Sequence, residues 1–380
     1  MKILFIARTY GAFNLKKDYL TLLIDHLEKQ DHVIDIYDPK KRIYFNINKE
    51  KAGEVFKVPS FIMKIKPAYF IINIIALATF LYNRRKDYSV VHFFNIRYEL
   101  LFISNVLPLV KAKKIGTLYG GEYYLNPIRK LFAFIYKKFD LLTCQKDELK
   151  RDIINYYGKH VSVPIKILPM PVTAFHKIDY LNNSLVTKSE IKEQFNIDPD
   201  SKVIVCGTNA NKNEQHEMII DNLLGVNKEK KVTFIFPLTY DGPKDYIDKV
   251  KNKIQSKLFG YSVKIFLDFM SLEEVTRLRF ITDIFINIRK TDQFNIAMLE
   301  SLYAGSYLIY GKWLQYDLIK RQKLNYSAVN TNNDIGSIIN KLIYDDELLM
   351  RYANENKHNV RNLGHPNNVL PLWESVYRTI

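Results

Sequence analysis

The chain has 380 residues, 47% hydrophobic and 25% charged, which is too long for one ordinary hydrophobic core and predicts two domains. Its two cysteines, Cys144 and Cys206, lie far apart within apolar segments. They indicate neither a disulfide framework nor a metal-ligand spacing, and they favour an intracellular protein.

The net charge of +16 is concentrated in the first half of the chain. Residues 1–180 contain 30 Lys and Arg against 16 Asp and Glu, whereas residues 181–380 contain 26 against 24. We therefore expect the first half to meet an anionic surface. No nucleic-acid-binding module is recognisable, so an anionic membrane is favoured over nucleic acid.

The first half alternates strand-like and helix-like segments. The opening MKILFIA has a single lysine before a short apolar run, which predicts a strand rather than a signal peptide. A helix is predicted over about 15–29, and further strands in HVIDIYD, YSVVHFFN, KKIGTLYGG and LLTCQ. This alternation predicts a parallel α/β domain over residues 1–175.

Two segments of this domain raise the question of membrane contact. The apolar run 67–82 is shorter than the roughly 20 residues of a spanning helix, and basic residues flank it. Residues 127–140 combine basic and aromatic residues in one amphipathic pattern. For each, a helix in the membrane interface and an ordinary helix with solvated lysines both remain open.

The second half restarts the alternation after a polar linker at residues 182–189. KVIVCGT, KVTFIFPL, VKIFLDF, DIFINIRK and SYLIYG are predicted strands, each followed or preceded by a helical pattern. We predict a second domain over 176–380. The sequence leaves open which of the two domains its last helix packs on. The expected fold class is α/β, with two Rossmann-like parallel-sheet domains and a cleft at the carboxyl ends of their strands.

The stretch TDQFNIAMLESLYAGSYLIYG carries two acids near a predicted helix. Asp292 precedes the helical pattern, Glu300 lies within it, and Gly305 ends it. The free N–H groups at the start of this helix suit a phosphate. Asp292 would then face the sugar end of a phosphorylated ligand, and Glu300 would accept hydrogen bonds from ribose hydroxyls.

This stretch resembles the acid-x7-acid motif of retaining GT-B glycosyltransferases such as family 4. Asp292 stands for the first glutamate, Phe294 for the phenylalanine and Glu300 for the second glutamate, while Gln293 and Asn295 replace two glycines. The loop CGTNANKNEQHEMI also resembles that of bacterial 4-acetamidofucose transferases, which act on a lipid carrier. The first-domain segment LYGGEYY resembles family strand ends that face the acceptor.

The resemblance implies a metal-independent, retaining hexosyltransferase without a cofactor, acting on a nucleotide-diphosphate sugar. The implied catalytic residues are Asp292, Glu300 and Lys212. The family has both an arginine and a lysine in the region of Lys212, and we expect Arg289, before Asp292, to supply the missing charge as a fourth catalytic residue. The implied donor-binding residues are Gly207, Asn209, His216, Phe269, Met270, Lys290, Phe294, Asn295 and Ile296. The implied acceptor-binding residues are Gly11, Tyr119, Gly120, Gly121 and Glu122.

The expected acceptor is a hydroxyl of a lipid-linked or surface glycan in bacterial-type polysaccharide synthesis. The expected location is the cytoplasm, peripheral on the inner face of the plasma membrane, with no nucleic-acid partner. The alternative is an inactive GT-B scaffold subunit at the membrane that supports a partner transferase. The lost glycines favour the scaffold, and the retained acids favour the enzyme.

Overall fold

The computed structural model describes residues 1–7, 19–46, 51–54, 65–124, 127–292, 295–314, 316–330 and 334–380. They form two compact units. Unit 1 comprises Met1–Pro171 and Asn367–Ile380, and unit 2 comprises Val172–Pro366. The division predicted after residue 175 falls inside helix α7 (Ala174–Asn183), and the end of the chain belongs to unit 1.

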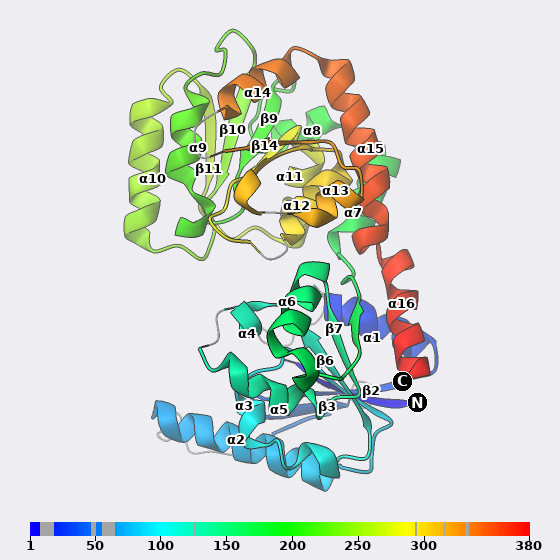
Figure 1. Cartoon of the computed structure of the whole chain (residues 1–380). Helices are drawn as coiled ribbons and strands as arrows, with labels where there is room; N and C mark the ends of the chain where they lie inside the picture. Colours follow the sequence, from blue (N-terminus) through cyan, green and yellow to red (C-terminus); the bar gives the residue numbers. More distant parts are fainter. Residues whose placement is uncertain are drawn as a thin grey trace. The chain divides into compact units, whose positions relative to one another are not determined.

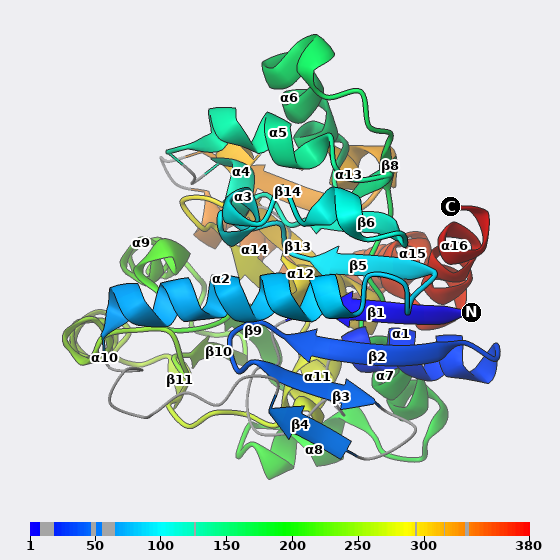
Figure 2. The same cartoon turned by 90° about the horizontal axis from the view of Figure 1, so that it is seen from below.

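Unit 1 is built on an eight-stranded sheet (Figure 2). In spatial order its strands are β4 (Lys51–Glu54), β3 (Ile43–Asn46), β2 (Val33–Asp38), β1 (Lys2–Ile6), β5 (Val90–Phe94), β6 (Lys113–Leu118), β7 (Leu141–Cys144) and β8 (Ile165–Ile167). The pairs that include β3 are antiparallel, and the other pairs are parallel. Residues of β1 and β5 are buried on both faces, which explains their continuous apolar runs.

Helices cover both faces of this sheet. Its helical segments are α1 (Tyr19–Lys29), α2 (Lys66–Asn83), α3 (Glu99–Phe102), η4 (Leu107–Leu109), α4 (Gly121–Tyr124), η5 (Arg129–Leu131), α5 (Phe132–Tyr136), α6 (Asp147–Tyr157), η6 (Gly158–His160) and α16 (Pro366–Thr379). The core of one face packs against α2, α3, α5 and α6, and that of the other against α1 and α16.

Unit 2 contains a six-stranded, all-parallel sheet (Figure 1). The order is β11 (Ser262–Phe266), β10 (Val232–Pro237), β9 (Lys202–Cys206), β12 (Ile284–Asn287), β13 (Tyr307–Gly311) and β14 (Tyr326–Val329). The strand order reverses between β9 and β12, and in such sheets ligands bind outside the carboxyl ends at that point.

Two cores flank the unit 2 sheet. Its helical segments are α7, α8 (Lys188–Gln194), η7 (Lys212–Glu214), α9 (His216–Leu223), α10 (Lys244–Lys257), α11 (Leu272–Ile281), α12 (Ile296–Ala304), η8 (Lys312–Leu314), α13 (Asp317–Arg321), α14 (Ile335–Ile343) and α15 (Asp346–Gly364). One core packs against α7, α8, α11 and α12, and the other against α9, α10 and α14. The α/β class with two parallel-sheet domains, predicted from the sequence, is confirmed.

The ten predicted strands are β1, β2, β5, β6, β7, β9, β10, β11, β12 and β13. β3, β4, β8 and β14, by contrast, were not predicted as strands. The segment predicted as one helix over 127–140 divides into η5 and α5, so that prediction was too long. The helix predicted from about residue 15 is described only from Tyr19 onward.

Candidate functional site

A cavity of about 440 Å³ lies in unit 2, next to the segments that follow β9, β10 and β12. It is therefore at the switch point of the strand order, where parallel sheets bind ligands. Its lining residues are Thr208, Asn209, Pro237, Thr239, Tyr240, Phe269, Met270, Val275, Leu278, Arg279, Arg289, Asn295, Ile296, Ala297 and Glu300. We call it the unit-2 cavity.

Helix α12 presents its amino-terminal end to this cavity, because Ile296 and Ala297 line the space. Asn295 is the N-cap, and its side-chain oxygen accepts a hydrogen bond from the Met298 backbone N–H at 3.3 Å. Asn295 stands at a position where the family motif has a glycine. The replacement thus supplies a helix cap, and the end of the helix remains a favourable place for negative charge.

Glu300 lies one turn further along α12 and forms part of the cavity wall. Its Oε2 is 3.5 Å from Nε of Arg279 on α11. Burial raises the pKa of Glu300, while the Arg279 guanidinium opposes that rise. A carboxylate held in this way is a hydrogen-bond acceptor for hydroxyl groups of a ligand.

Arg279 was not among the predicted site residues. Only 5% of it is exposed, and one of its guanidinium nitrogens, Nη1, is buried without a hydrogen-bond partner among the described residues. A buried cationic donor beside a cavity is costly unless something accepts from it. Its signal in the sequence is an arginine between Leu278 and Phe280, inside an otherwise apolar helical face.

Arg289 follows β12 in the chain and belongs to a second network of charged side chains. Its Nε is 3.5 Å from Oε1 of Glu214, and its Nη1 is 3.6 Å from Oδ1 of Asp292. The other Asp292 oxygen, Oδ2, accepts a hydrogen bond from the Tyr316 hydroxyl. Arg289 lines the cavity, whereas Asp292 is not among the lining residues. Asp292 is therefore placed to orient Arg289.

Glu214, which was also not predicted as a site residue, lies at the end of η7 in the segment that follows β9. It is 1% exposed and accepts a hydrogen bond from the Thr208 hydroxyl at 2.6 Å. Burial raises the pKa of Glu214, with Arg289 opposing the rise. Gly207 has a φ of +79°, and a Cβ there would lie 3.1 Å from both Glu214 Oε2 and His216 Nε2. Gly207 thus allows the loop to close over these two side chains.

The predicted catalytic and donor-binding residues differ in where they lie relative to the unit-2 cavity. Asn209, Phe269, Met270, Asn295, Ile296, Glu300 and Arg289 line the unit-2 cavity. Gly207 and His216 are not among its lining residues, and burial lowers the pKa of His216 to about 4. Lys212 and Lys290 are exposed and line no part of it; Lys212 Nζ is instead 3.7 Å from Asp245. Phe294 lies outside the described residues.

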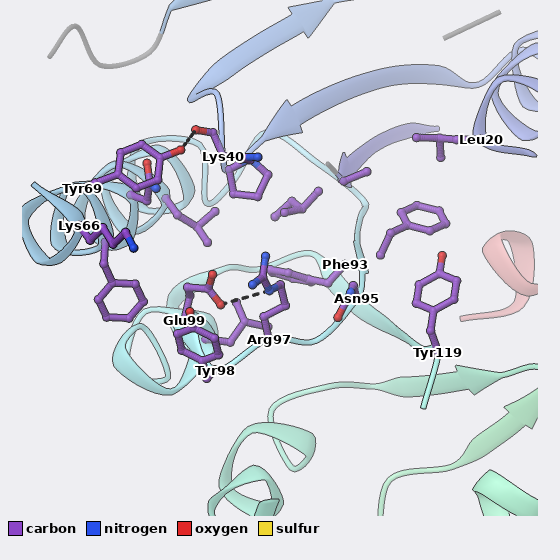
Figure 3. Close-up of a pocket in the computed structure, with 18 of the residues that line it drawn as sticks. Leu20, Lys40, Lys66, Tyr69, Phe93, Asn95, Arg97, Tyr98, Glu99 and Tyr119 are labelled. Atoms are coloured by element: carbon purple, nitrogen blue, oxygen red, sulfur yellow. Dashed lines mark hydrogen bonds and ion pairs between the residues drawn. The ribbon is translucent and has the colours of Figure 1, made fainter. Parts of the chain in front are cut away.

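A second cavity, of about 500 Å³, lies in unit 1 (Figure 3). We call it the unit-1 cavity. Among the predicted acceptor residues, Tyr119 lines it, and its hydroxyl is 2.5 Å from that of Tyr19. Gly120 follows β6 with a φ of +97°, a conformation that favours glycine, and α4 begins at Gly121. Glu122 lies within α4, and Gly11 lies outside the described residues.

The described residues contain neither a metal-binding cluster nor a membrane-spanning helix. Within those ranges, His, Cys, Asp and Glu side chains form no group of three that would hold a metal ion. Over the same part of the chain, no helix has the length and apolarity needed to cross a membrane.

The whole chain is similar to several solved structures. A glycosyltransferase from Rickettsia africae has a TM-score of 0.76 at 15% identity, over 99% of this chain and 97% of that one. Anabaena HepE in complex with UDP and glucose has a TM-score of 0.70 at 12% identity, over 100% of both chains. Sucrose-phosphate synthase from Thermosynechococcus elongatus has a TM-score of 0.68 at 11% identity, over 99% and 98%.

No protein-family model matches the chain, and no curated protein sequence does either. The fold is nevertheless clear, because the structural likeness extends over nearly the full length of each chain compared. It is the GT-B fold, with two parallel-sheet domains, as the resemblance in residues 291–311 implied.

Proposed function

We propose that the protein is a glycosyltransferase that takes a sugar from a nucleoside diphosphate donor held in the unit-2 cavity. The observation that carries the proposal is the composition of that cavity. One wall combines Glu300, Arg279 and the start of α12 at the switch point of a parallel sheet. The likeness to HepE, solved with UDP and glucose, supports a uridine nucleotide as the first donor to test.

The proposed roles follow from charge. Glu300 accepts hydrogen bonds from the ribose hydroxyls, and the Arg279 guanidinium favours the ionised form of that carboxylate, opposing the rise in its pKa that burial causes. The N–H groups at the start of α12, together with Arg289, stabilise the negative charge that develops on the departing diphosphate. Asp292, which does not line the cavity, contributes by holding Arg289 in place. Lys212 and Lys290, which line no part of the cavity, are less suited to this task.

In the proposed reaction, the bond between the anomeric carbon and the diphosphate oxygen breaks, and its electron pair leaves with the diphosphate. The acceptor hydroxyl oxygen bonds to the same carbon and loses its proton to the departing phosphate. The resemblance to retaining enzymes favours retention of the anomeric configuration. The acceptor we favour is a lipid-linked or surface glycan, and the reaction needs no metal in this scheme.

An association with an anionic membrane is part of the proposal, and helix α2 supports it. Ile71, Ile75 and Tyr82 are 55%, 47% and 47% exposed, and after Lys66 the helix contains no charged residue. Arg84, Arg85 and Lys86 follow it directly. An exposed apolar face with cations at both ends suits the headgroup region of an anionic bilayer. This would place the protein peripherally on the inner face of the plasma membrane.

The scaffold alternative keeps one observation in its favour. Both arginines of the unit-2 cavity are already near carboxylates, Arg279 near Glu300 and Arg289 near Glu214 and Asp292. A site whose cations are all balanced attracts a diphosphate less strongly. Direct binding of a nucleotide therefore separates the enzyme from the scaffold.

The first test is a thermal-shift screen of the full-length protein with UDP, GDP, dTDP and CMP and their sugar conjugates, without added metal. A ligand that binds the folded state alone raises its melting temperature with concentration. We expect saturable stabilisation by one base, and at least tenfold weaker binding in Glu300→Gln. The matched control, Glu347→Gln on α15, changes an exposed glutamate and should bind as the wild type does. If no nucleotide shifts the wild type, the scaffold becomes the better description.

A further inference from the structure

The unit-1 cavity lies within one unit, where the carboxyl ends of β1 and β5 meet the amino-terminal half of α2 (Figure 3). Much of its inner surface is apolar, with Ile6, Leu20, Phe93 and Phe94 from the sheet and α1, and Leu77 from α2. Polar side chains enter from the loops after β2 and β5. The cavity therefore has an apolar interior and a charged part, which is the character of a site for an amphipathic molecule.

Arg97 is the polar residue whose surroundings are least complete. It lies in the loop after β5, two residues after Asn95, which has a φ of +80°. Its Nε is 3.6 Å from Oε2 of Glu99, and its guanidinium carbon is 5.7 Å from the centre of the Tyr98 ring. Its Nη1 is buried and has no hydrogen-bond partner among the described residues. That donor calls for an acceptor atom, which an anionic ligand in the cavity would provide.

The cavity is also positively charged. Lys40, Lys66 and Arg97 line it, against the single carboxylate of Glu99 among its lining residues. In Figure 3 the Lys66 amine and the Arg97 guanidinium are directed toward the same space. The Tyr69 hydroxyl donates a hydrogen bond to the Lys40 backbone oxygen at 2.8 Å, which holds the loop after β2 against α2. Such a set suits a phosphate or diphosphate group, which accepts from several cations at once.

Helix α2 connects this cavity to the exposed apolar face described above. Lys66, Phe70, Asn73 and Leu77 line the cavity at helical spacing. Ile71, on another side of the same helix, is exposed. One helix thus has a wall of the cavity on one side and the proposed lipid-contacting surface on another. A ligand with a phosphate and an apolar chain would find both environments at α2.

We propose that the unit-1 cavity binds a phosphate ester with an apolar chain, as the part of the acceptor that carries the hydroxyl-bearing sugar. Arg97 and Lys66 hold the phosphate, and the apolar interior takes the first part of the chain. This deepens the proposed function by giving the acceptor its chemical class. The phosphate could belong to a lipid-linked saccharide or to a soluble sugar phosphate, and the apolar interior favours the former.

Calorimetric titration of the full-length protein with three probes below their micellar concentrations tests the proposal. Octyl phosphate has the charge and the chain, octyl glucoside has the chain without the charge, and glucose 6-phosphate has the charge without the chain. We expect octyl phosphate to bind at least tenfold more tightly than either of the others. Arg97→Gln and Lys66→Gln should each weaken octyl phosphate roughly tenfold, the effect of losing one charge-assisted contact.

Lys159→Gln, at an exposed lysine of η6 outside the cavity, is the matched control and should leave the affinity unchanged. Equal binding of octyl glucoside, or an unchanged affinity in Arg97→Gln, would overturn the phosphate site. Glucose 6-phosphate binding as tightly as octyl phosphate would overturn the apolar-chain requirement. The UDP thermal shift, measured on the same samples, reports on unit 2 separately, so a failure of the donor proposal is distinguishable from a failure here.

Discussion

Glu300 and Arg279 form the contact on which the proposed donor site most depends. The helical pattern around Glu300 predicted a carboxylate on a buried face, and its side chain does line the unit-2 cavity. Its partner lies 21 residues earlier on a different helix, so no local spacing reveals it. Local periodicity predicts which face of a helix a residue occupies, but not the residue that it meets from another helix.

Arg279→Gln should affect both stability and binding. It leaves a buried Glu300 carboxylate without its cation, so we expect the free energy of unfolding to fall by about 3 kcal/mol. UDP affinity should fall at least tenfold. Urea denaturation and calorimetry measure the two effects.

The double variant Arg279→Gln/Glu300→Gln removes both charges and should recover most of the stability but not the UDP affinity. Arg277→Gln, at a half-buried position two residues earlier on α11, is the control and should change the stability by less than about 1 kcal/mol, because its ion pair with Glu273 is close to solvent. Normal UDP binding in the double variant would remove this pair from the donor site.

At the scale of elements, long apolar patterns were predicted better than short ones. Residues 67–82 were predicted as a helix candidate, and α2 spans Lys66–Asn83. The helix predicted over residues 127–140 was too long, because only Phe132–Tyr136 form the α-helix α5 before the chain continues to β7. β4 was missed because the short edge strand KAGE lacks an apolar signal and depends on its neighbour for hydrogen bonds. β3 has the apolar residues of IYFN but is only four residues long, which is too short to show a clear alternation.

The outer face of α2 is open to a direct test of membrane binding. Ile71→Glu/Ile75→Glu places two charges on that face, and we expect the fraction of protein that sediments with anionic lipid vesicles to fall at least tenfold. Phe259→Glu/Met350→Glu alters two exposed apolar residues of unit 2 and serves as the matched control. Equal sedimentation of both variants with the wild type would exclude α2 as the contact.

At the scale of the whole molecule, the chain starts and ends in unit 1. Helix α16 packs on the sheet of unit 1, where the Trp373 indole donates a hydrogen bond to the Pro169 carbonyl oxygen at 2.8 Å. His92 on β5 is buried, with Nδ1 2.6 Å from the Tyr377 hydroxyl and Nε2 2.7 Å from that of Thr117. His92 is therefore a packed strand histidine whose two ring nitrogens both have partners.

The buried His92 predicts a loss of stability of unit 1 in acid. Burial holds its pKa well below 6.5 in the folded state, so the unfolded chain takes up the proton first. Below pH 6.5 the free energy of unfolding should therefore fall by about 1.4 kcal/mol per pH unit. Trp373 lies in unit 1 and the other tryptophan, Trp313, in unit 2. Urea denaturation of Trp313→Phe at pH 7 and 5.5, followed by fluorescence, thus reports on unit 1.

His92→Gln in the same background is the control for that slope. It is less stable at pH 7, because the packing and hydrogen bonds of His92 are altered, but its stability should change little between pH 7 and 5.5. An equally steep slope in this variant would assign the acid sensitivity to other groups. In unit 2 the effect of His216 is opposed, because burial raises the pKa values of Glu214 and Glu300.

The sequence by itself determined the α/β class, the two domains and the helix that carries Glu300, because strands buried on both faces and helices with one apolar face leave regular patterns. Only the tertiary structure decided which charged groups meet. It paired Arg279 with Glu300, set Arg289 between Glu214 and Asp292, and left Lys212 outside the cavity. Those contacts join residues from different elements, and their geometry depends on how helices pack on the sheet, which no local pattern encodes.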